Sequence, residues 1–213
     1  MMGHRGCRIG VTTPEVYNTQ VRAIFEAACL VARDGVVVMP EVMIPLVSMP
    51  TELERCRKQV EETAEQVLAE NNVRIDYKVG TMIELPRACV LAAEISAHAD
   101  FFSFGTNDLT QMTYGFSRDD MGKYFTEYLH KGVLKESPLS VFDVEGVGQL
   151  VKMAAERARE AKPRMKLGVC GEHGGDPTGV AFFHRIGLDY VSCSPFRVPV
   201  ARLAAAHAAL GVL

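Results

Sequence analysis

Short apolar runs alternate with longer amphipathic stretches along the chain. We predict five buried strands, within residues 36–47, 77–83, 101–104, 165–169 and 188–193. Amphipathic helices are predicted over residues 14–33, 51–67, 85–97, 144–161, from 177 onward and over 200–210. Strands that are apolar on both faces and separated by helices are typical of a parallel sheet with crossover helices. The pattern therefore predicts the α/β class.

The number of strands leaves two architectures open. A (β/α)₈ barrel has eight strands and about 250 residues, whereas this chain has 213 residues and five predicted strands. The chain is therefore either an open five-stranded α/β domain or about the last five βα units of a barrel. No linker or internal repeat divides it, so we expect a single domain over residues 1–213.

Composition and charge narrow the range of partners. The net charge is −3 and the pI is about 6.1, which disfavours binding to nucleic acid or to an anionic membrane surface. No apolar run approaches the roughly 18 residues that span a bilayer. The six cysteines are scattered without a C-x-x-C pair, so we expect buried thiols in a reducing compartment, the cytoplasm.

Polar residues follow directly after several of the predicted strands. Glu84, the run Thr106-Asn107-Asp108, Cys170, and Ser194 with Arg197 all occupy such positions. The carboxyl ends of parallel strands share one edge of the sheet, where α/β folds carry their sites. These segments are therefore predicted to bring polar groups to one common rim.

The carboxylates Glu84 and Asp108 are candidate metal ligands. Mg²⁺ commonly takes one or two protein carboxylates and leaves its other positions to water and substrate oxygens. The alternative is that Glu84 is a helix N-terminal charge and Asp108 a turn residue. Gly105, Thr106 and Asn107 offer backbone N–H groups at a point where a ligand could approach closely.

Cys170 and Arg5 are further candidates for chemistry. A thiol between a strand and Gly171 could be a nucleophile, a proton donor or an inert loop residue. His173 lies close in sequence, but the spacing gives no reason to expect its ring to meet the thiol. Arg5 lies in a short basic segment near the start, where its guanidinium could bind a carboxylate or phosphate.

Several segments together resemble one enzyme family, the phosphoenolpyruvate (PEP)-utilising enzymes. Residues 80–87 (GTMIELPR) resemble the motif on the family's fifth barrel strand, and residues 102–111 (FSFGTNDLTQ) resemble its signature. Residues 4–6 (HRG), 114–120 (YGFSRDD) and 171–175 (GEHGG) favour the pyruvate phosphate dikinases within the family. The likeness extends from about residue 3 to residue 203.

The resemblance implies a fold and a site. The family's C-terminal (β/α)₈ barrel binds pyruvate or PEP with Mg²⁺ and exchanges a phosphoryl group with a phosphohistidine on another domain. Carried over by motif, Glu84 and Asp108 would bind Mg²⁺ and Cys170 would donate a proton. Residues 105–108 would line the ligand, and Arg5 stays a candidate for binding it on the chemistry of its guanidinium.

The resemblance also implies what is missing. Family arginines on earlier barrel strands would precede residue 3, so the chain is expected to be an N-terminally truncated barrel domain. We expect it either to associate as a homodimer or to rearrange its N-terminal segment, because truncation exposes apolar surface and an unpaired strand edge. The alternatives are a PEP synthase-like enzyme or an inactive structural fragment.

Overall fold

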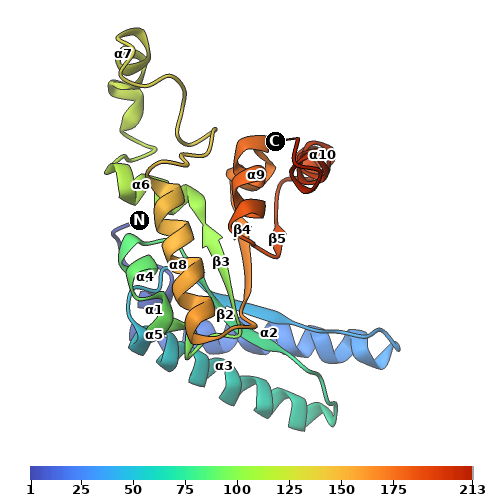
Figure 1. The fold of residues 1–213 in the computed structure, drawn as a ribbon. Helices are drawn as coiled ribbons and strands as arrows, with labels where there is room; N and C mark the ends of the chain where they lie inside the picture. The colour runs from blue at the N-terminus through green and yellow to red at the C-terminus, as the bar shows by residue number, and fades with distance from the viewer. Residues whose placement is uncertain (213) are drawn as a thin grey trace.

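The computed structural model describes residues 1–212 as a five-stranded parallel sheet with helices around it (Figure 1). The strands are β1 (Glu41–Ile44), β2 (Lys78–Ile83), β3 (Phe101–Gly105), β4 (Lys166–Cys170) and β5 (Tyr190–Val191). The longer helices are α2 (Pro14–Arg33), α3 (Pro50–Asn71), α6 (Thr106–Tyr114), α8 (Val147–Ala161), α9 (Pro177–Arg185) and α10 (Val198–Ala209). The shorter ones are α1 (Cys7–Thr12), α4 (Pro86–Val90), α5 (Ala92–Ser96) and α7 (Phe125–His130), with single 3₁₀ turns η1 (Met121–Lys123), η2 (Glu172–Gly175) and η3 (Pro195–Arg197).

The strand order confirms the predicted α/β class and separates the two architectures left open by the sequence. The strands are hydrogen-bonded in the order β1-β2-β3-β4-β5, and every neighbouring pair is parallel. Each crossover in this order leads to the next strand on the same side. Because such crossovers are right-handed, their helices all lie on one face of the sheet. A doubly wound sheet would instead reverse direction and cover both faces. The five units are therefore arranged as in an arc of a (β/α)₈ barrel.

Burial differs between the two faces of the sheet. The side chains towards the helices are fully buried, including Phe102, Phe104, Leu167 and Val169. On the opposite face, Lys166 of β4 forms an ion pair with Glu41 of β1, with 2.9 Å between Nζ and Oε1. In a flat sheet these two strands would lie about 14 Å apart. The ion pair therefore indicates that the sheet curls towards this face.

Two strands are shorter than the sequence predicts. Residues 36–39 are apolar but lie outside β1, and Val37 is 87% exposed. Proline has no N–H to donate to a ladder, and Pro40 and Pro45 directly flank the four residues of β1. β5 has only two residues, although the Ser192 N–H still donates to the Val169 carbonyl over 2.8 Å.

Two helical regions also differ from expectation. Residues 85–97 form two short helices rather than one, because the chain turns at Leu91 between α4 and α5. The Thr106-Asn107-Asp108 run, for which no helix was predicted, is the first turn of α6. Within residues 1–212, no helix is both long enough and apolar enough to cross a membrane.

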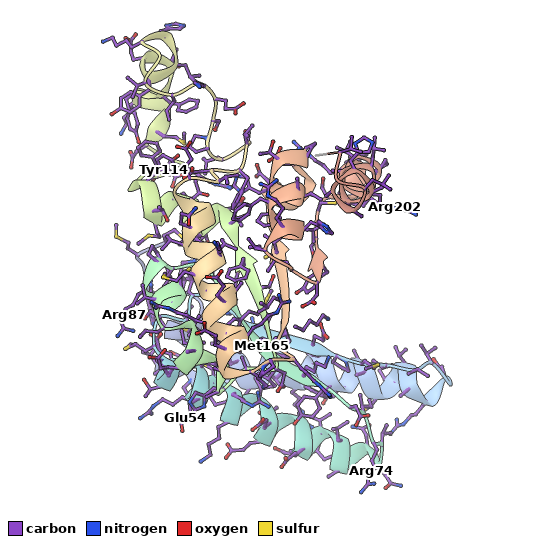
Figure 2. The ribbon with its side chains drawn as sticks, viewed as in Figure 1. Glu54, Arg74, Arg87, Tyr114, Met165 and Arg202 are labelled. Atoms are coloured by element: carbon purple, nitrogen blue, oxygen red, sulfur yellow. The ribbon has the colours of Figure 1, made fainter. Side chains whose placement is uncertain are left out.

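An arm formed by residues 115–141 projects from the carboxyl end of the sheet. It begins after Tyr114 and includes η1 and α7, which extend away from the body (Figure 1). Figure 2 shows Tyr114 at the base of the arm and Met165 at the opposite end of α8. Aromatic contacts stabilise the arm, with the ring centroids of Phe116 and Tyr124 5.6 Å apart. The arm therefore rises from the rim on which the sequence predicts the site.

Close packing between β2 and β3 generates a test of this sheet. A Cβ on Gly80 would lie 2.5 Å from the carbonyl oxygen of Phe101 on β3. We expect Gly80→Ala to lower the free energy of unfolding by about 1–3 kcal/mol through overpacking. Urea denaturation measures this change. Gly122→Ala is the control, because no atom lies within 4 Å of its added Cβ. Equal stability of the two variants would contradict the packing of β2 on β3.

Candidate functional site

The carboxyl ends of the first four strands meet at one rim. Gly105, the last residue of β3, is paired with Cys170, the last residue of β4. A Cβ added to Gly105 would lie 2.8 Å from Oε2 of Glu84, which follows β2. The predicted residues Glu84, Gly105 and Cys170 are therefore immediate neighbours, brought together by the parallel register of the sheet.

The Glu84 carboxylate is buried and fixed by the turn after β1. Only 3% of Glu84 is exposed, and its Oε1 accepts a hydrogen bond of 2.6 Å from the Leu46 N–H. Leu46 has φ 59°, a left-handed conformation that is unusual for a leucine. Gly6 packs against it, since a Cβ there would lie 2.9 Å from the Leu46 side chain. Residues held in such strained backbone conformations by the surrounding structure cluster at functional sites.

Glu84 and Asp108 are close enough to interact directly. Burial raises the pKa of Glu84 to about 7, although the hydrogen bond from Leu46 lowers this pKa. The negative charge of Asp108 and a hydrogen bond with it raise the pKa further, and the positive charge of Arg5 lowers it. The structure thus places Asp108 next to the buried carboxyl and Arg5 within range of its charge.

This carboxylate pair suits a hard divalent cation. Two adjacent carboxylates, one of them buried, repel each other unless a proton or a cation lies between them. Across residues 1–212, no group of three or more His, Cys, Asp and Glu side chains converges as a metal site. Two carboxylates are nevertheless the number that Mg²⁺ commonly takes from a protein. Glu84 and Asp108 therefore fit Mg²⁺ better than they fit a metal that requires a complete protein cage.

The Cys170 thiol lies beside the two carboxyl groups. Burial raises its pKa, a hydrogen bond with Ser103 lowers it, and the charges of Glu84 and Asp108 raise it. A raised pKa keeps the thiol protonated near neutral pH. The group therefore has the protonation state of a proton donor rather than that of a thiolate nucleophile.

Sequence reasoning missed two residues beside this thiol. Ser103 is 2% exposed and lies two residues before Gly105, on the same face of β3. Burial raises the pKa of Tyr190, and a hydrogen bond with Ser103 lowers it. Side chains alternate between the two faces of a strand, so the sequence could have placed Ser103 on the same face as Gly105 and the site. The position of Tyr190 beside the thiol follows only from the register of β5 against β4, which the sequence does not reveal.

The start of α6 is attached to the turn after β4. The Thr106 hydroxyl lies 3.2 Å from the Cys170 carbonyl oxygen. The Glu172 N–H donates to Oδ1 of Asn107 over 3.3 Å. Gly171 has φ 102°, and a Cβ there would lie 3.1 Å from Asn107 Oδ1. The close approach of the two turns therefore depends on glycine at this position.

His173 is not a partner of the Cys170 thiol. Its Nδ1 lies 2.9 Å from the Thr106 hydroxyl, and its Nε2 lies 3.0 Å from the Pro138 carbonyl oxygen. Burial lowers the pKa of the imidazole, which favours the neutral ring. Both ring nitrogens are engaged elsewhere, so the structure supports no Cys-His dyad.

A cavity of about 310 Å³ adjoins the start of α6. Its lining residues come from the start of α6 and from the segments after β4 and β5, and are Asn107, Gly171, Glu172, Ser192, Cys193, Ser194 and Arg197. Ser194 and Arg197 follow the last strand and therefore reach the same region of the rim as Asn107, as predicted.

Comparisons with known proteins agree with the motifs. A family model described as "PEP-utilising enzyme, PEP-binding domain" matches residues 1–210. The chloroplastic pyruvate, phosphate dikinase of Flaveria bidentis is 59% identical over 207 residues, which cover 97% of this chain and 22% of that protein. Pyruvate, phosphate dikinase 2 of Oryza sativa subsp. japonica is 57% identical over 210 residues, which cover 99% of this chain and 24% of that protein. The chain thus spans about a quarter or less of the length of these relatives. A solved citrate lyase from Burkholderia xenovorans LB400 is 14% identical, with a TM-score of 0.49, over 78% of this chain and 48% of that one.

The raised pKa of Glu84 generates a test that needs no ligand. Because its pKa is raised from 4.5 to about 7, the folded chain keeps a proton that the unfolded chain releases between these values. The resulting stabilisation is complete below pH 4.5 and is lost as the pH rises to 7. We expect this contribution to the free energy of unfolding to fall by about 3 kcal/mol over that range.

Urea denaturation from pH 4.5 to 7.5 in EDTA measures this loss. Glu84→Gln carries no titrating group at this position, so its stability should fall less over the range. Glu54→Gln, on an exposed position of α3 (Figure 2), is the matched control and should follow the wild type. If the free energy of unfolding of Glu84→Gln changed with pH as much as that of the wild type, the buried environment of the Glu84 carboxyl would be contradicted.

Proposed function

The chain belongs to the PEP-utilising enzyme family through its PEP-binding domain, and from this membership we propose that it carries out the PEP/pyruvate half-reaction of a pyruvate, phosphate dikinase. In this half-reaction a phosphoryl group moves between PEP or pyruvate and a phosphohistidine on another domain. The overall reaction converts ATP, phosphate and pyruvate to AMP, diphosphate and PEP. The observation that carries the proposal is the Cys170 thiol beside the Glu84–Asp108 pair.

The domain assignment is part of the same proposal. We take residues 1–213 as part of a C-terminal PEP/pyruvate-binding barrel, with the remaining barrel strands upstream. Support comes from the singly wound strand order and from the two edge strands, β1 and β5, which have one hydrogen-bonded neighbour each. The dikinase relatives, of which this sequence matches 22–24%, have room for the missing strands and domains.

The side chains of the rim have separate roles in this proposal. Glu84 and Asp108 would bind Mg²⁺, whose charge stabilises the enolate that forms when PEP loses its phosphoryl group. Gly105, Thr106 and Asn107 line the ligand at the start of α6. Arg5, which is exposed at the rim and lowers the pKa of Glu84, is available for the ligand's carboxylate or phosphate.

Cys170 would move the proton. Breaking the P–O bond of PEP and forming a P–N bond to histidine leaves the enolate of pyruvate. The protonated thiol then gives its proton to C3 of the enolate, which yields pyruvate and a thiolate. The hydrogen bond with Ser103 lowers the pKa of Cys170 and so stabilises that thiolate. In the reverse direction the thiolate removes the proton from pyruvate.

Two alternatives remain testable. A PEP synthase would catalyse the same half-reaction but would need no inorganic phosphate and make no diphosphate. The identity of 57–59% to dikinases favours the dikinase. The third possibility is that the isolated chain is an inactive structural piece. We also propose a reducing compartment such as the cytoplasm, because all six cysteines are free thiols.

Replacing Cys170 tests the proton-transfer role. In the complete enzyme that carries this chain, we expect Cys170→Ala to lower pyruvate–PEP turnover by about a hundredfold or more, because the enolate loses its positioned acid. The ATP-dependent half-reaction takes place on another domain and should not change. Isotope exchange of each half-reaction measures both rates.

The matched control is Cys193→Ala, the other half-buried thiol near this rim. It should keep full turnover. Cys170→Ala should also retain Mg²⁺-dependent PEP binding by calorimetry, whereas Asp108→Ala should weaken it. Normal turnover in Cys170→Ala would refute its role as proton donor.

Association of two copies is the last part of the proposal. Large apolar side chains are exposed next to both sheet edges, with Val37 87% and Phe196 94% accessible. We expect the chain to sediment as a dimer at micromolar concentration and Val37→Glu to weaken it, because the charge opposes burial of the patch. Val133→Glu, on the arm at a position 61% exposed, is the control. A monomer at all concentrations would contradict the dimer.

A further inference from the structure

His173 is a fully buried titratable group near the rim that the proposed chemistry leaves unused. It is 0% exposed and belongs to the 3₁₀ turn η2, three residues after Cys170. Its ring contacts Phe142 edge to face, with the centroids 5.5 Å apart. A buried imidazole of this kind needs a partner for each ring nitrogen, and both partners belong to segments that border the site.

The two partners fix the state of the ring. The Pro138 carbonyl can only accept, so Nε2 of His173, 3.0 Å away, must carry the hydrogen. Burial lowers the pKa of the ring, and in the neutral tautomer with hydrogen on Nε2, Nδ1 is an acceptor. The Thr106 hydroxyl, 2.9 Å away, therefore donates to Nδ1.

This donation has a consequence for the Cys170 turn. Thr106 has one hydroxyl hydrogen and two acceptors within reach, Nδ1 of His173 at 2.9 Å and the Cys170 carbonyl at 3.2 Å. With His173 in place, the hydroxyl is directed towards the ring. The imidazole thus determines the orientation of the Thr106 hydroxyl. Thr106 is the first residue of α6 and lies next to the backbone of Cys170, the residue proposed to move the proton.

We propose that His173 is a positioning residue for the PEP/pyruvate site. Through Nδ1 it fixes the Thr106 hydroxyl, and with it the first turn of α6, against the Cys170–Glu172 turn. This hydrogen bond then sets the spacing between the Cys170 thiol and the ligand-lining residues Asn107 and Asp108, together with the bond from the Glu172 N–H to Asn107. The inference rests on the proposed function, which supplies the roles of these residues.

The same ring also connects the site to the arm. Nε2 binds Pro138 near the end of the arm, and the Phe142 N–H donates over 3.2 Å to the buried carboxylate of Asp176. A change at His173 could therefore act on the arm rather than on Thr106. The test must separate the two bonds of the ring.

Two amide substitutions make that separation. An asparagine amide occupies the position of Nδ1 and can still bind Thr106, whereas a glutamine amide reaches the position of Nε2 and can still donate to Pro138. We expect His173→Gln to raise hydrogen–deuterium exchange at residues 105–108 and at the Glu172 amide by about tenfold, the effect of one buried hydrogen bond. His173→Asn should raise exchange at these amides less, and should raise it at residues 139–142 instead.

Steady-state kinetics of the complete enzyme provide the functional readout. His173→Gln should lower kcat for pyruvate–PEP turnover by about tenfold, with KM changed by less than about threefold, because the proton donor is displaced while ligand contacts remain. His173→Asn should lose less. Equal losses of kcat in the two variants, or a loss confined to KM, would overturn the proposal.

Thr106 offers the same test from the other side of the bond. If His173→Gln fails to fold, Thr106→Val removes the hydroxyl while keeping the side-chain shape, and Thr106→Ser restores it. Thr106→Val should reproduce the raised exchange at Glu172, and Thr106→Ser should not; identical exchange in these two variants would overturn the proposal. A wild-type enzyme that neither binds PEP nor turns it over would refute the proposed function, whereas the exchange measurements would still decide whether His173 positions Thr106.

Discussion

The close approach of β3 to the Glu84 carboxylate sets the geometry of the rim. Gly105 has no side chain, so the backbone at the end of β3 lies where a Cβ would be 2.8 Å from the carboxylate oxygen. The parallel register then pairs Gly105 with Cys170. A larger residue at position 105 would separate the acid from the thiol, and every other contact of the site would move with them.

The electrostatics follow from this proximity. Burial raises the pKa of both Glu84 and Cys170, and the charges of the two carboxylates raise that of the thiol further. A bound divalent cation would offset these negative charges. It would therefore favour ionised Glu84 and make the thiol a stronger acid, because the thiolate would no longer face two uncompensated carboxylates. In the proposed function, metal binding and proton transfer would thus be coupled through charge.

Much of this fold follows from sequence pattern, because parallel strands buried against helices must be apolar. The same rule misplaces residues 36–39, which are equally apolar but largely exposed and precede Pro40. The proximity of Glu84, Asp108 and Cys170 could be predicted because each lies at or just after the carboxyl end of a strand. The donor from Leu46 and the partners of His173 could not be found, since one depends on a left-handed backbone angle and the others on contacts between residues 35 or more positions apart. The helical first turn of α6 was missed because the residues that start it are also common in loops.

Hydrogen bonds hold the turns of the rim in two pairs, and the carboxyls of Glu84 and Asp108 meet between these pairs. The turn after β1 is bound to Glu84 through the Leu46 N–H, and the start of α6 is bound to the Cys170 turn through Thr106 and Asn107. These two pairs meet where the carboxyls of Glu84 and Asp108 interact. That contact is attractive while a proton or cation lies between the two groups and repulsive when both are charged and bare. The contact between these two carboxyls is therefore the one whose sign depends on what is bound, and this is where a metal-bound substrate would contribute most.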